Sequence, residues 1–270
     1  MSEASSAVAR YGVREQIEVA SATDEAVESL RLLGYAVLDG GYSTAELDAF
    51  SSAFDEAHAG LVSRYGLDHL TAIDEHNTIR AMLSTHSAFI ALASNRPVLE
   101  VCRRLIGGAI VLNQQNGIVN PANNQRYNQG SYHRDLPYQH FVSSRPLAIN
   151  ALFCLDAFTP DNGATRVLPA THKQEAFPSD HMIQAIETKV TAPRGSFILL
   201  DCMTYHSGGA NRTAARRRAV NHVYTIPLLK QQISLPDLLG DDFTGDEELR
   251  KLLGYPYRTP TDLSAYYKSR

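Results

Sequence analysis

The sequence predicts a mainly β fold with flanking helices, in which the strands form a sandwich or a closed double sheet. Before Gly107, apolar residues recur at helical spacing, whereas from there to about residue 230 short β-rich runs alternate with Gly, Pro, Asn and Asp breaks. Many short strands at such spacing are typical of two packed or closed sheets. The 270 residues therefore indicate helices first and then one β-rich core, within a single domain.

The first part of the chain is predicted to be helical over 23–106, after a flexible lead-in over 1–22 that is small and polar. A helix is predicted over 23–33 with Thr23 as its N-cap, followed by a short strand over 34–39. Ser43 or Thr44 then begins a second helix that runs to about residue 64. A third helical region is predicted over 87–106, with an interruption at Pro97.

The β-rich core is predicted over 107–230, where apolar runs are bounded by turn-forming residues. The predicted strands cover 109–112, 117–119, 148–158, 165–168, 189–191, 196–200 and 219–226. A C-terminal segment, 231–270, follows with a brief helix after residue 245 and a tail that contains Tyr and Pro.

Composition excludes several classes of protein. The formal net charge of -4 and the pI near 6.2 argue against general binding of nucleic acid, which requires a basic face. Cys102, Cys154 and Cys202 are widely spaced within apolar runs, so we expect buried free thiols. Neither a secretory signal nor an apolar stretch of the ~20 residues needed to span a bilayer is visible. We therefore expect a cytoplasmic protein that binds neither nucleic acid nor membranes; its oligomeric state is not predicted.

His133 and Asp135 are the first candidate metal ligands. Side chains two residues apart on an extended strand point to the same side, so one imidazole and one carboxylate would reach a single point. These are two of the three ligands of the facial triad that binds non-haem Fe(II). His206 is the candidate third ligand, because it follows an apolar strand and precedes a turn-rich run. The alternative for His133 and Asp135 is a surface strand on which both residues pair with neighbours. The alternative for His206 is a polar cap at the sheet edge.

Arg217 lies eleven residues beyond His206, where the last predicted strand begins. Alternation places Arg217, Ala219 and Asn221 on one face of this strand. A guanidinium group can bind a carboxylate through two parallel hydrogen bonds, and the small Ala219 would leave room for such a ligand. The alternative is a solvated arginine within the basic run 216–218.

In combination, the H-x-D unit, a histidine about 70 residues later and an arginine eleven residues further resemble the phytanoyl-CoA dioxygenase family of Fe(II)/2-oxoglutarate-dependent oxygenases. The segments 33–47, 162–172, 206–211 and 217–220 resemble family stretches in the same order. The resemblance covers most of the chain, and implies a double-stranded β-helix, the jelly-roll core of cupins, in an oxygenase domain over 23–270. It implies that His133, Asp135 and His206 form the catalytic centre and bind Fe(II).

The resemblance also implies 2-oxoglutarate as co-substrate and O2 as oxidant, with succinate and CO2 as products. Arg217 would bind the distal carboxylate of 2-oxoglutarate, and Asn120 matches an amide or lysine that the family often places on the strand before the H-x-D unit. Gly208 stands where many members have a serine, and Ser207, one place earlier, is a further candidate contact. With Asp135 present, hydroxylation is the expected outcome rather than halogenation. Desaturation, cyclisation or epimerisation at the same iron centre is the alternative.

Amides, phenols and cations flank the H-x-D unit, which favours a polar small-molecule substrate over a fatty acyl-CoA. A sugar, a nucleotide-linked metabolite or a natural-product intermediate would fit. The candidate substrate contacts are Arg126, Tyr132, Arg134, Tyr138, His76 and Arg80. Two other functions stay open: a cupin-like metal enzyme without 2-oxoglutarate, in which Arg217 has no role, and a non-catalytic metabolite-binding descendant, which would have lost a metal ligand.

Overall fold

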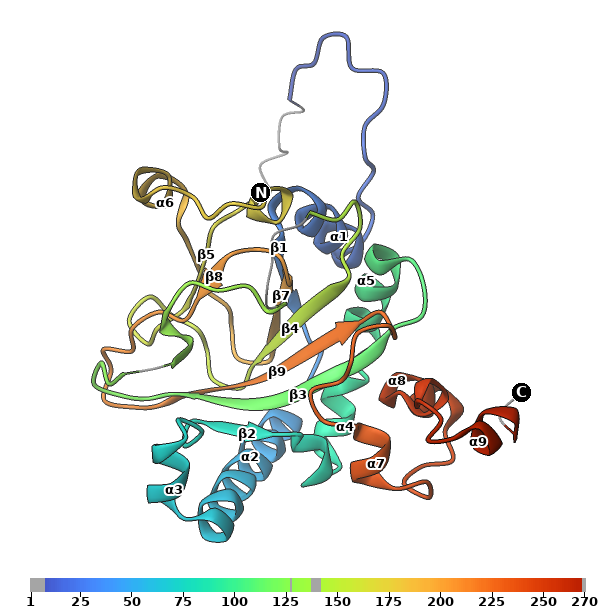
Figure 1. Cartoon of the computed structure of the whole chain (residues 1–270). Helices are drawn as coiled ribbons and strands as arrows, with labels where there is room; N and C mark the ends of the chain where they lie inside the picture. The colour runs from blue at the N-terminus through green and yellow to red at the C-terminus, as the bar shows by residue number, and fades with distance from the viewer. Residues whose placement is uncertain (1–7, 127, 137–141, 269–270) are drawn as a thin grey trace.

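Two antiparallel sheets form the core of the computed structural model, which describes residues 8–126, 128–136 and 142–268 (Figure 1). The larger sheet runs in the order β1 (Tyr35–Asp39), β7 (Ser196–Asp201), β4 (Ala148–Cys154), β9 (Arg217–Thr225), β3 (Val111–Asn120) and β2 (Thr78–Arg80). The smaller sheet runs in the order β6 (Thr188–Val190), β5 (Thr165–Val167) and β8 (His206–Ser207). Most neighbouring strands are not consecutive in sequence, as in a jelly roll, and the predicted fold class is confirmed.

The two sheets pack face to face through a small apolar core. Leu200 of the larger sheet and Val167 of the smaller one belong to the same buried cluster. The opposite face of the larger sheet packs against the helices through a larger cluster that includes Phe153, Phe197 and Tyr224. The larger sheet is therefore covered on both faces, which explains why most of its strand residues are buried.

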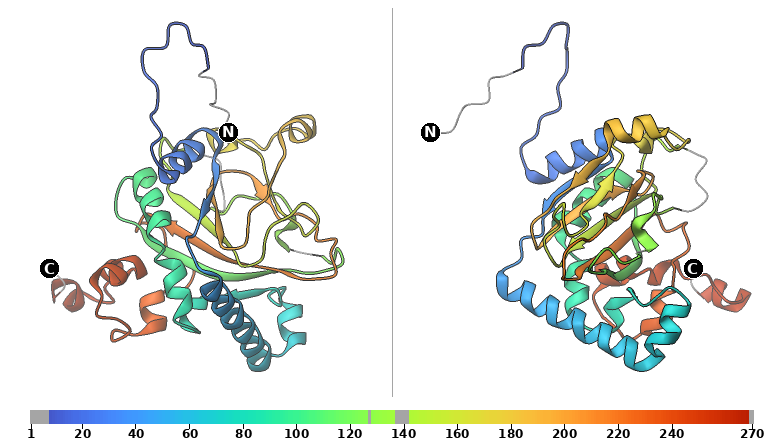
Figure 2. Two further views of the ribbon diagram at one scale, coloured as in Figure 1. Left: turned by 180° about the vertical axis from the view of Figure 1, so that it is seen from behind. Right: turned by 90° about the vertical axis from the view of Figure 1, so that its left-hand side faces the viewer.

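Four helices of the N-terminal part pack against the larger sheet, and Figure 2 shows the long α2 lying along one side of it. They are α1 (Ala22–Leu33), α2 (Thr44–Tyr65), α4 (Ala88–Ala93) and α5 (Arg96–Ile106). The predicted helix 23–33 is confirmed, but its N-cap is Ser21 and not Thr23, because the Ser21 hydroxyl accepts a hydrogen bond from the Asp24 amide. Ser43 caps α2 in a reciprocal capping box with Glu46.

The third helical region is interrupted before Pro97 and not at it. α4 ends at Ala93, and Asn95 caps α5 by accepting a hydrogen bond from the Val98 amide at 3.2 Å. Pro97 lies in the first turn of α5, where its missing N–H would have had no partner within the helix. The proline is therefore part of a helix start.

The strands differ from prediction in length and number. The runs 109–112 and 117–119 form the single strand β3, because the polar residues between them pair with β9 across a register shift next to Leu112. The run 148–158 ends as a strand at Cys154. Neither β2, with three residues, nor β8, with two, was predicted.

The remaining elements connect or flank the sheets. They include five short helices, α3 (Leu67–Ala72), α6 (Asp180–Ile186), α7 (Leu235–Leu239), α8 (Glu247–Leu253) and α9 (Leu263–Lys268). Single 3₁₀ turns lie at Met82–Ser84, Asn128–Gly130, Thr171–Lys173 and Tyr255–Tyr257. The C-terminal helices lie together beyond the end of the larger sheet (Figure 1). Residues 8–20 have no helix or strand and project from the body of the protein.

The structure also describes the cysteines and the length and polarity of the helices. Cys102, Cys154 and Cys202 are buried and free, as expected. Of the helices that the structure describes, none is both long enough and apolar enough to cross a membrane.

Candidate metal centre

The H-x-D unit lies beside β8 and is held there by backbone hydrogen bonds. His133 and His206 exchange two of them, at 2.9 and 3.0 Å, and the Asp135 amide donates to the Cys202 carbonyl at 3.1 Å. We expected a regular strand at this position, but His133 forms only an isolated bridge with His206. The three bonds nevertheless keep the unit extended, so His133 and Asp135 point to the same side as predicted.

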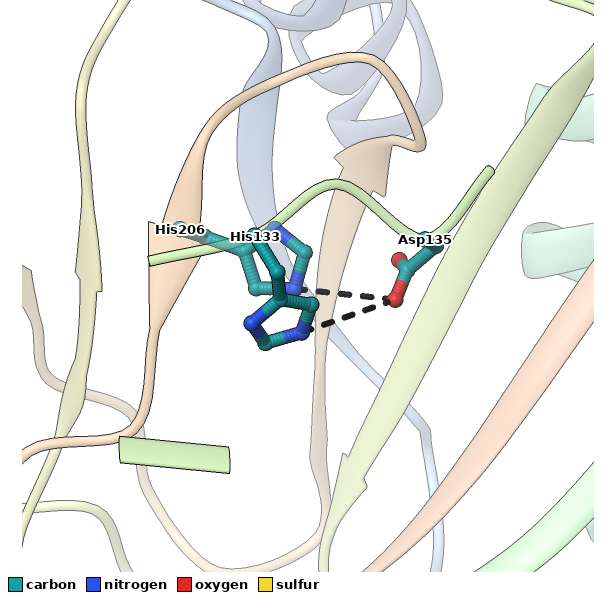
Figure 3. Close-up of side chains that lie close together, drawn as sticks. All are labelled: His133, Asp135 and His206. Carbon is teal, nitrogen blue, oxygen red and sulfur yellow. Dashed lines mark ion pairs between the residues drawn. The ribbon is translucent and has the colours of Figure 1, made fainter. Parts of the chain in front are cut away.

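The side chains of His133, Asp135 and His206 converge on one point (Figure 3). Asp135 Oδ1 lies 4.0 Å from His133 Nε2 and 3.7 Å from His206 Nε2, and one donor atom from each residue lies within 4.8 Å of the others. The structure thus brings together all three predicted ligands, which come from two segments separated by 70 residues of sequence.

Backbone carbonyls fix the orientation of both imidazole rings. His133 Nδ1 lies 2.9 Å from the Ser131 carbonyl oxygen, and His206 Nδ1 lies 3.0 Å from that of Thr204. A carbonyl only accepts hydrogen bonds, so each Nδ1 carries a proton and each Nε2 is the nitrogen on the side of Asp135. Such a contact on the far nitrogen commonly orients a metal-ligating histidine.

Burial keeps His206 in its neutral form. The loss of hydration lowers the pKa of His206 and the neighbouring His133 lowers it further, while Asp135 acts in the opposite direction. A metal therefore need not compete with a proton for this ring at neutral pH. Two imidazoles and a carboxyl group on one side of a cavity are the donor set of a facial non-haem Fe(II) site, so the residues present fit this metal.

The metal ligands open onto a small cavity between the two sheets. Its apolar lining comes from Ile118, Leu152, Leu200 and Ala219, and its polar lining includes Gln129, Asn150, Thr165, Arg217 and Asn221. Arg217, Ala219 and Asn221 share this lining, which confirms the predicted face of β9. On the opposite face, Val220 belongs to the helix-side core and His222 contacts Phe197 of that core.

Arg217 is the buried cation of this cavity. The residue is 3% exposed, and its guanidinium carbon lies 3.7 Å from the centre of the Phe158 ring. The aromatic face holds the planar group in place through a cation–π contact. The arginine therefore reaches the same cavity as the metal ligands, although it begins a different strand of the other sheet from His206.

Asn120 and Ser207, the other predicted contacts of 2-oxoglutarate, do not line the cavity. Asn120 is opposite Arg217 in the sheet, but its amide donates to the Gly209 carbonyl at 2.9 Å and so fastens the segment after β8. Ser207 pairs with Arg166 and alternates with His206, which directs its side chain to the other side of β8. Gly208 lines the cavity in its place.

Tyr132 and Arg134 were predicted to contact the substrate, but both side chains face away from the metal ligands. Both alternate with His133 and Asp135 along the extended unit. The Tyr132 hydroxyl donates to the Glu187 carboxylate, and burial raises its pKa. Arg134, 5% exposed, donates to the Thr171 carbonyl at 2.9 Å and lies 3.9 Å from the centre of the Tyr205 ring. Their contacts attach the H-x-D unit to the neighbouring loops.

The other candidate substrate residues lie apart from the ligand set. His76 Nε2 contacts the Asn77 amide at 2.9 Å, and Arg126 is exposed. Arg80 is paired with Glu75, with its Nε 2.9 Å from a carboxylate oxygen, and both border a hollow of 680 Å³ between α2, α3 and β2. Tyr138 lies outside the described residues.

Asn150 is the main site residue that the sequence analysis did not identify. Its side-chain amide donates to Asp135 Oδ2 at 2.7 Å, which leaves Oδ1 facing the two histidines. The available signal was a single amide within the apolar run 148–154, but the sequence does not reveal that this strand passes beside Asp135. Gln129 and Thr165 line the cavity and were likewise not predicted.

Comparison with known proteins agrees with this geometry. Residues 30–219, more than half of the chain, match the phytanoyl-CoA dioxygenase (PhyH) family. An uncharacterized protein of Mycobacterium tuberculosis is 27% identical over 259 residues, with 94% of each chain covered. An iron/alpha-ketoglutarate-dependent dioxygenase of Penicillium thymicola is 34% identical over 92 residues, which cover 32% of this chain and 29% of the relative.

Solved structures share the fold. EctD from S. alaskensis with bound Fe has a TM-score of 0.60 and 21% identity, with 77% of each chain covered. The non-heme alpha ketoglutarate dependent epimerase SnoN from nogalamycin biosynthesis has a TM-score of 0.57 and 17% identity, covering 76% of this chain and 83% of SnoN. With its family match and its His-Asp-His ligand set, the chain belongs to the phytanoyl-CoA dioxygenase family and is an Fe(II)- and 2-oxoglutarate-dependent oxygenase.

Proposed function

We propose that this oxygenase hydroxylates an unactivated C–H bond of a polar small molecule, such as a sugar, a nucleotide-linked metabolite or a natural-product intermediate. The observation that carries the proposal is the meeting of three metal-ligating side chains and a buried arginine at one cavity. The carboxylate of Asp135 completes the ligand set, which favours hydroxylation over halogenation. A complete set also argues against a non-catalytic metabolite binder.

The chain contributes position and charge to the reaction. His133, Asp135 and His206 would hold Fe(II) from one side and leave positions toward the cavity for 2-oxoglutarate and O2. When bound, the iron and 2-oxoglutarate supply the oxidising chemistry, with succinate and CO2 as products. Arg217 would bind the distal carboxylate through two parallel hydrogen bonds, weakly screened because the residue is buried. A metal enzyme without 2-oxoglutarate would have no use for this arginine.

A row of polar side chains supports a polar substrate. From Asn221, which lines the metal cavity, the sheet register leads to Asn116 on β3 and then to Arg80 on β2. Directly opposed residues of antiparallel strands share a face, so the three side chains lie on the cavity side of the sheet. The Asn116 amide lies 3.1 Å from the side-chain oxygen of Gln232.

The charge of this row favours a substrate without a strong negative charge. Arg80 is its cation, and Glu75 neutralises it through two hydrogen bonds. Amides both donate and accept hydrogen bonds, as hydroxyl groups do. The row ends at Arg80, which also borders the hollow between α2, α3 and β2. These features support a hydroxyl-rich molecule and give no support to a fatty acyl chain.

The test combines a spectroscopic step with a catalytic one. Protein mixed anaerobically with Fe(II), 2-oxoglutarate and ascorbate should develop the weak visible charge-transfer band of the chelate. Admission of O2 with a panel of polar metabolites should then raise succinate formation above the substrate-free rate, with a hydroxylated product detected by mass spectrometry. A folded protein that gives no band, and whose Arg217→Ala variant behaves identically, would contradict the assignment of the co-substrate. A long-chain acyl-CoA that binds more tightly than every polar candidate would contradict the substrate class.

A further inference from the structure

Two amide oxygens in the metal cavity have no hydrogen-bond partner among the described residues. Asn150 is 4% exposed, and its amide nitrogen is engaged by Asp135, but its Oδ1 is buried and unbonded. Asn221 Oδ1 is buried and unbonded as well. Both residues line the cavity onto which the metal ligands open. Buried acceptors without a partner are uncommon in proteins and destabilise the fold unless a ligand or water satisfies them.

The sheet register places the two amides side by side. In the pairing of β4 with β9, Asn150 is opposite Val223 and Asn221 is opposite Leu152. Asn150 and Asn221 are therefore diagonal neighbours on one face, within reach of a single small group. The nitrogen of Asn150 is committed to the carboxylate of Asp135, so this amide can present only its oxygen to the cavity.

The chemistry of the co-substrate does not match these acceptors. At neutral pH 2-oxoglutarate is a dianion whose oxygens accept hydrogen bonds and donate none, as in ionised carboxylate side chains. Arg217, a pure donor, suits it, whereas an amide oxygen would repel it. The acceptors instead suit a ligand with hydroxyl or amino protons.

We propose that Asn150 and Asn221 form a subsite that accepts hydrogen bonds from a hydroxyl or amino group of the primary substrate, next to the carbon that is oxidised. This rests on the proposed function and adds one requirement to it: the substrate carries a hydrogen-bond donor close to the reacting C–H bond. Asn150 also donates a hydrogen bond to Asp135, so a substrate in this subsite is linked to this metal ligand through a single side chain.

A first test uses the protein with Mn(II) and 2-oxoglutarate and needs no substrate. In a crystal structure of this complex, 2-oxoglutarate should contact Arg217 and leave both amide oxygens to water. The dissociation constant of 2-oxoglutarate should change less than about threefold in Asn221→Leu, because one uncharged contact is worth about tenfold and none is expected here. Asn113→Leu, whose amide on β3 donates to the Lys230 carbonyl outside the cavity, is the matched control. A co-substrate seated against the two amides, or a tenfold loss of its affinity in Asn221→Leu alone, would overturn the proposal.

A second test asks what the subsite selects. Sugars and amino alcohols are compared with their O-methyl or N,N-dimethyl derivatives as stimulants of succinate formation. Capping the donor should lower kcat/KM by about tenfold or more in the wild-type protein, and by less than about threefold in Asn221→Leu. Capped compounds that are equally active, or a penalty that persists in the variant, would refute the subsite. If the wild-type protein fails to bind 2-oxoglutarate at all, it is the proposed function that fails.

Discussion

Replacement of Arg217 by methionine should weaken the binding of 2-oxoglutarate roughly 30- to 150-fold. The residue is 3% exposed and lies over Phe158, so the charge it offers to a carboxylate is poorly screened by water. Truncation of one partner of a buried charged pair costs about 2–5 kcal/mol. Methionine retains the apolar stem over Phe158 and leaves space for water, which favours about 2–3 kcal/mol, the lower end of that range.

The assay is an anaerobic titration of the Fe(II)-loaded protein with 2-oxoglutarate, followed by the charge-transfer band. Arg217→Lys keeps the charge but loses the planar pair of donors, so we expect an intermediate loss of about tenfold. Arg216→Met is the control, because the Arg216 side chain alternates with that of Arg217 and forms an ion pair with the half-exposed Asp55 at 2.8 Å. Equal affinities for wild type and Arg217→Met would refute the assignment of the co-substrate's carboxylate to this arginine.

Three further predictions follow from the contacts around the site. Asn150→Leu should weaken metal binding about tenfold, because Asp135 loses the donor that orients it; competition with a chelator measures this, and an unchanged affinity would show that the hydrogen bond does not matter. Arg134→Met should lower the melting temperature by several degrees, since about 2 kcal/mol of buried hydrogen bonds and stacking is lost; an unaltered melting curve would argue that these contacts are dispensable. Burial raises the pKa of Asp201 to about 6, above its unfolded value of 3.8, so the cost of burying its charge is full above pH 6 and disappears as the pH falls toward 4. Asp201→Asn removes this relief, and its unfolding free energy should fall more steeply than that of the wild type between pH 6 and pH 4, by about 1.4 kcal/mol per pH unit. Urea titrations across this range measure the difference, and parallel curves would contradict the sign.

Much of the fold follows from local pattern. The α2 helix is predictable because Ser43 and Glu46 form a capping box and its apolar residues recur at helical spacing. The core strands β4, β7 and β9 are predictable because they are buried on both faces and read as apolar runs. By contrast, β2 and β8 were not predicted, and their pairing with β3 and β5 makes them strands.

The residues of the site likewise include some that local pattern predicts and some that it does not. His133, Asp135 and Arg217 were recognisable because alternation along one strand or extended unit is a local property. The roles of Tyr132 and Arg134 were misjudged, since their partners Glu187 and Thr171 lie 37 to 55 residues away in the sequence. No local rule states which distant loop will cover the outer side of the H-x-D unit.

By itself the sequence determined the helix-then-strand order, the chemistry of the metal ligands and the face of β9 that carries Arg217. These depend on period and residue type, which neighbouring residues set. Only the tertiary structure decided that Asn150 would hold Asp135, that Asn221 would stand beside it and that Asn120 would bind a carbonyl instead of facing the cavity. Such contacts depend on the register between strands, and one residue of slip would reverse the face on which every side chain lies.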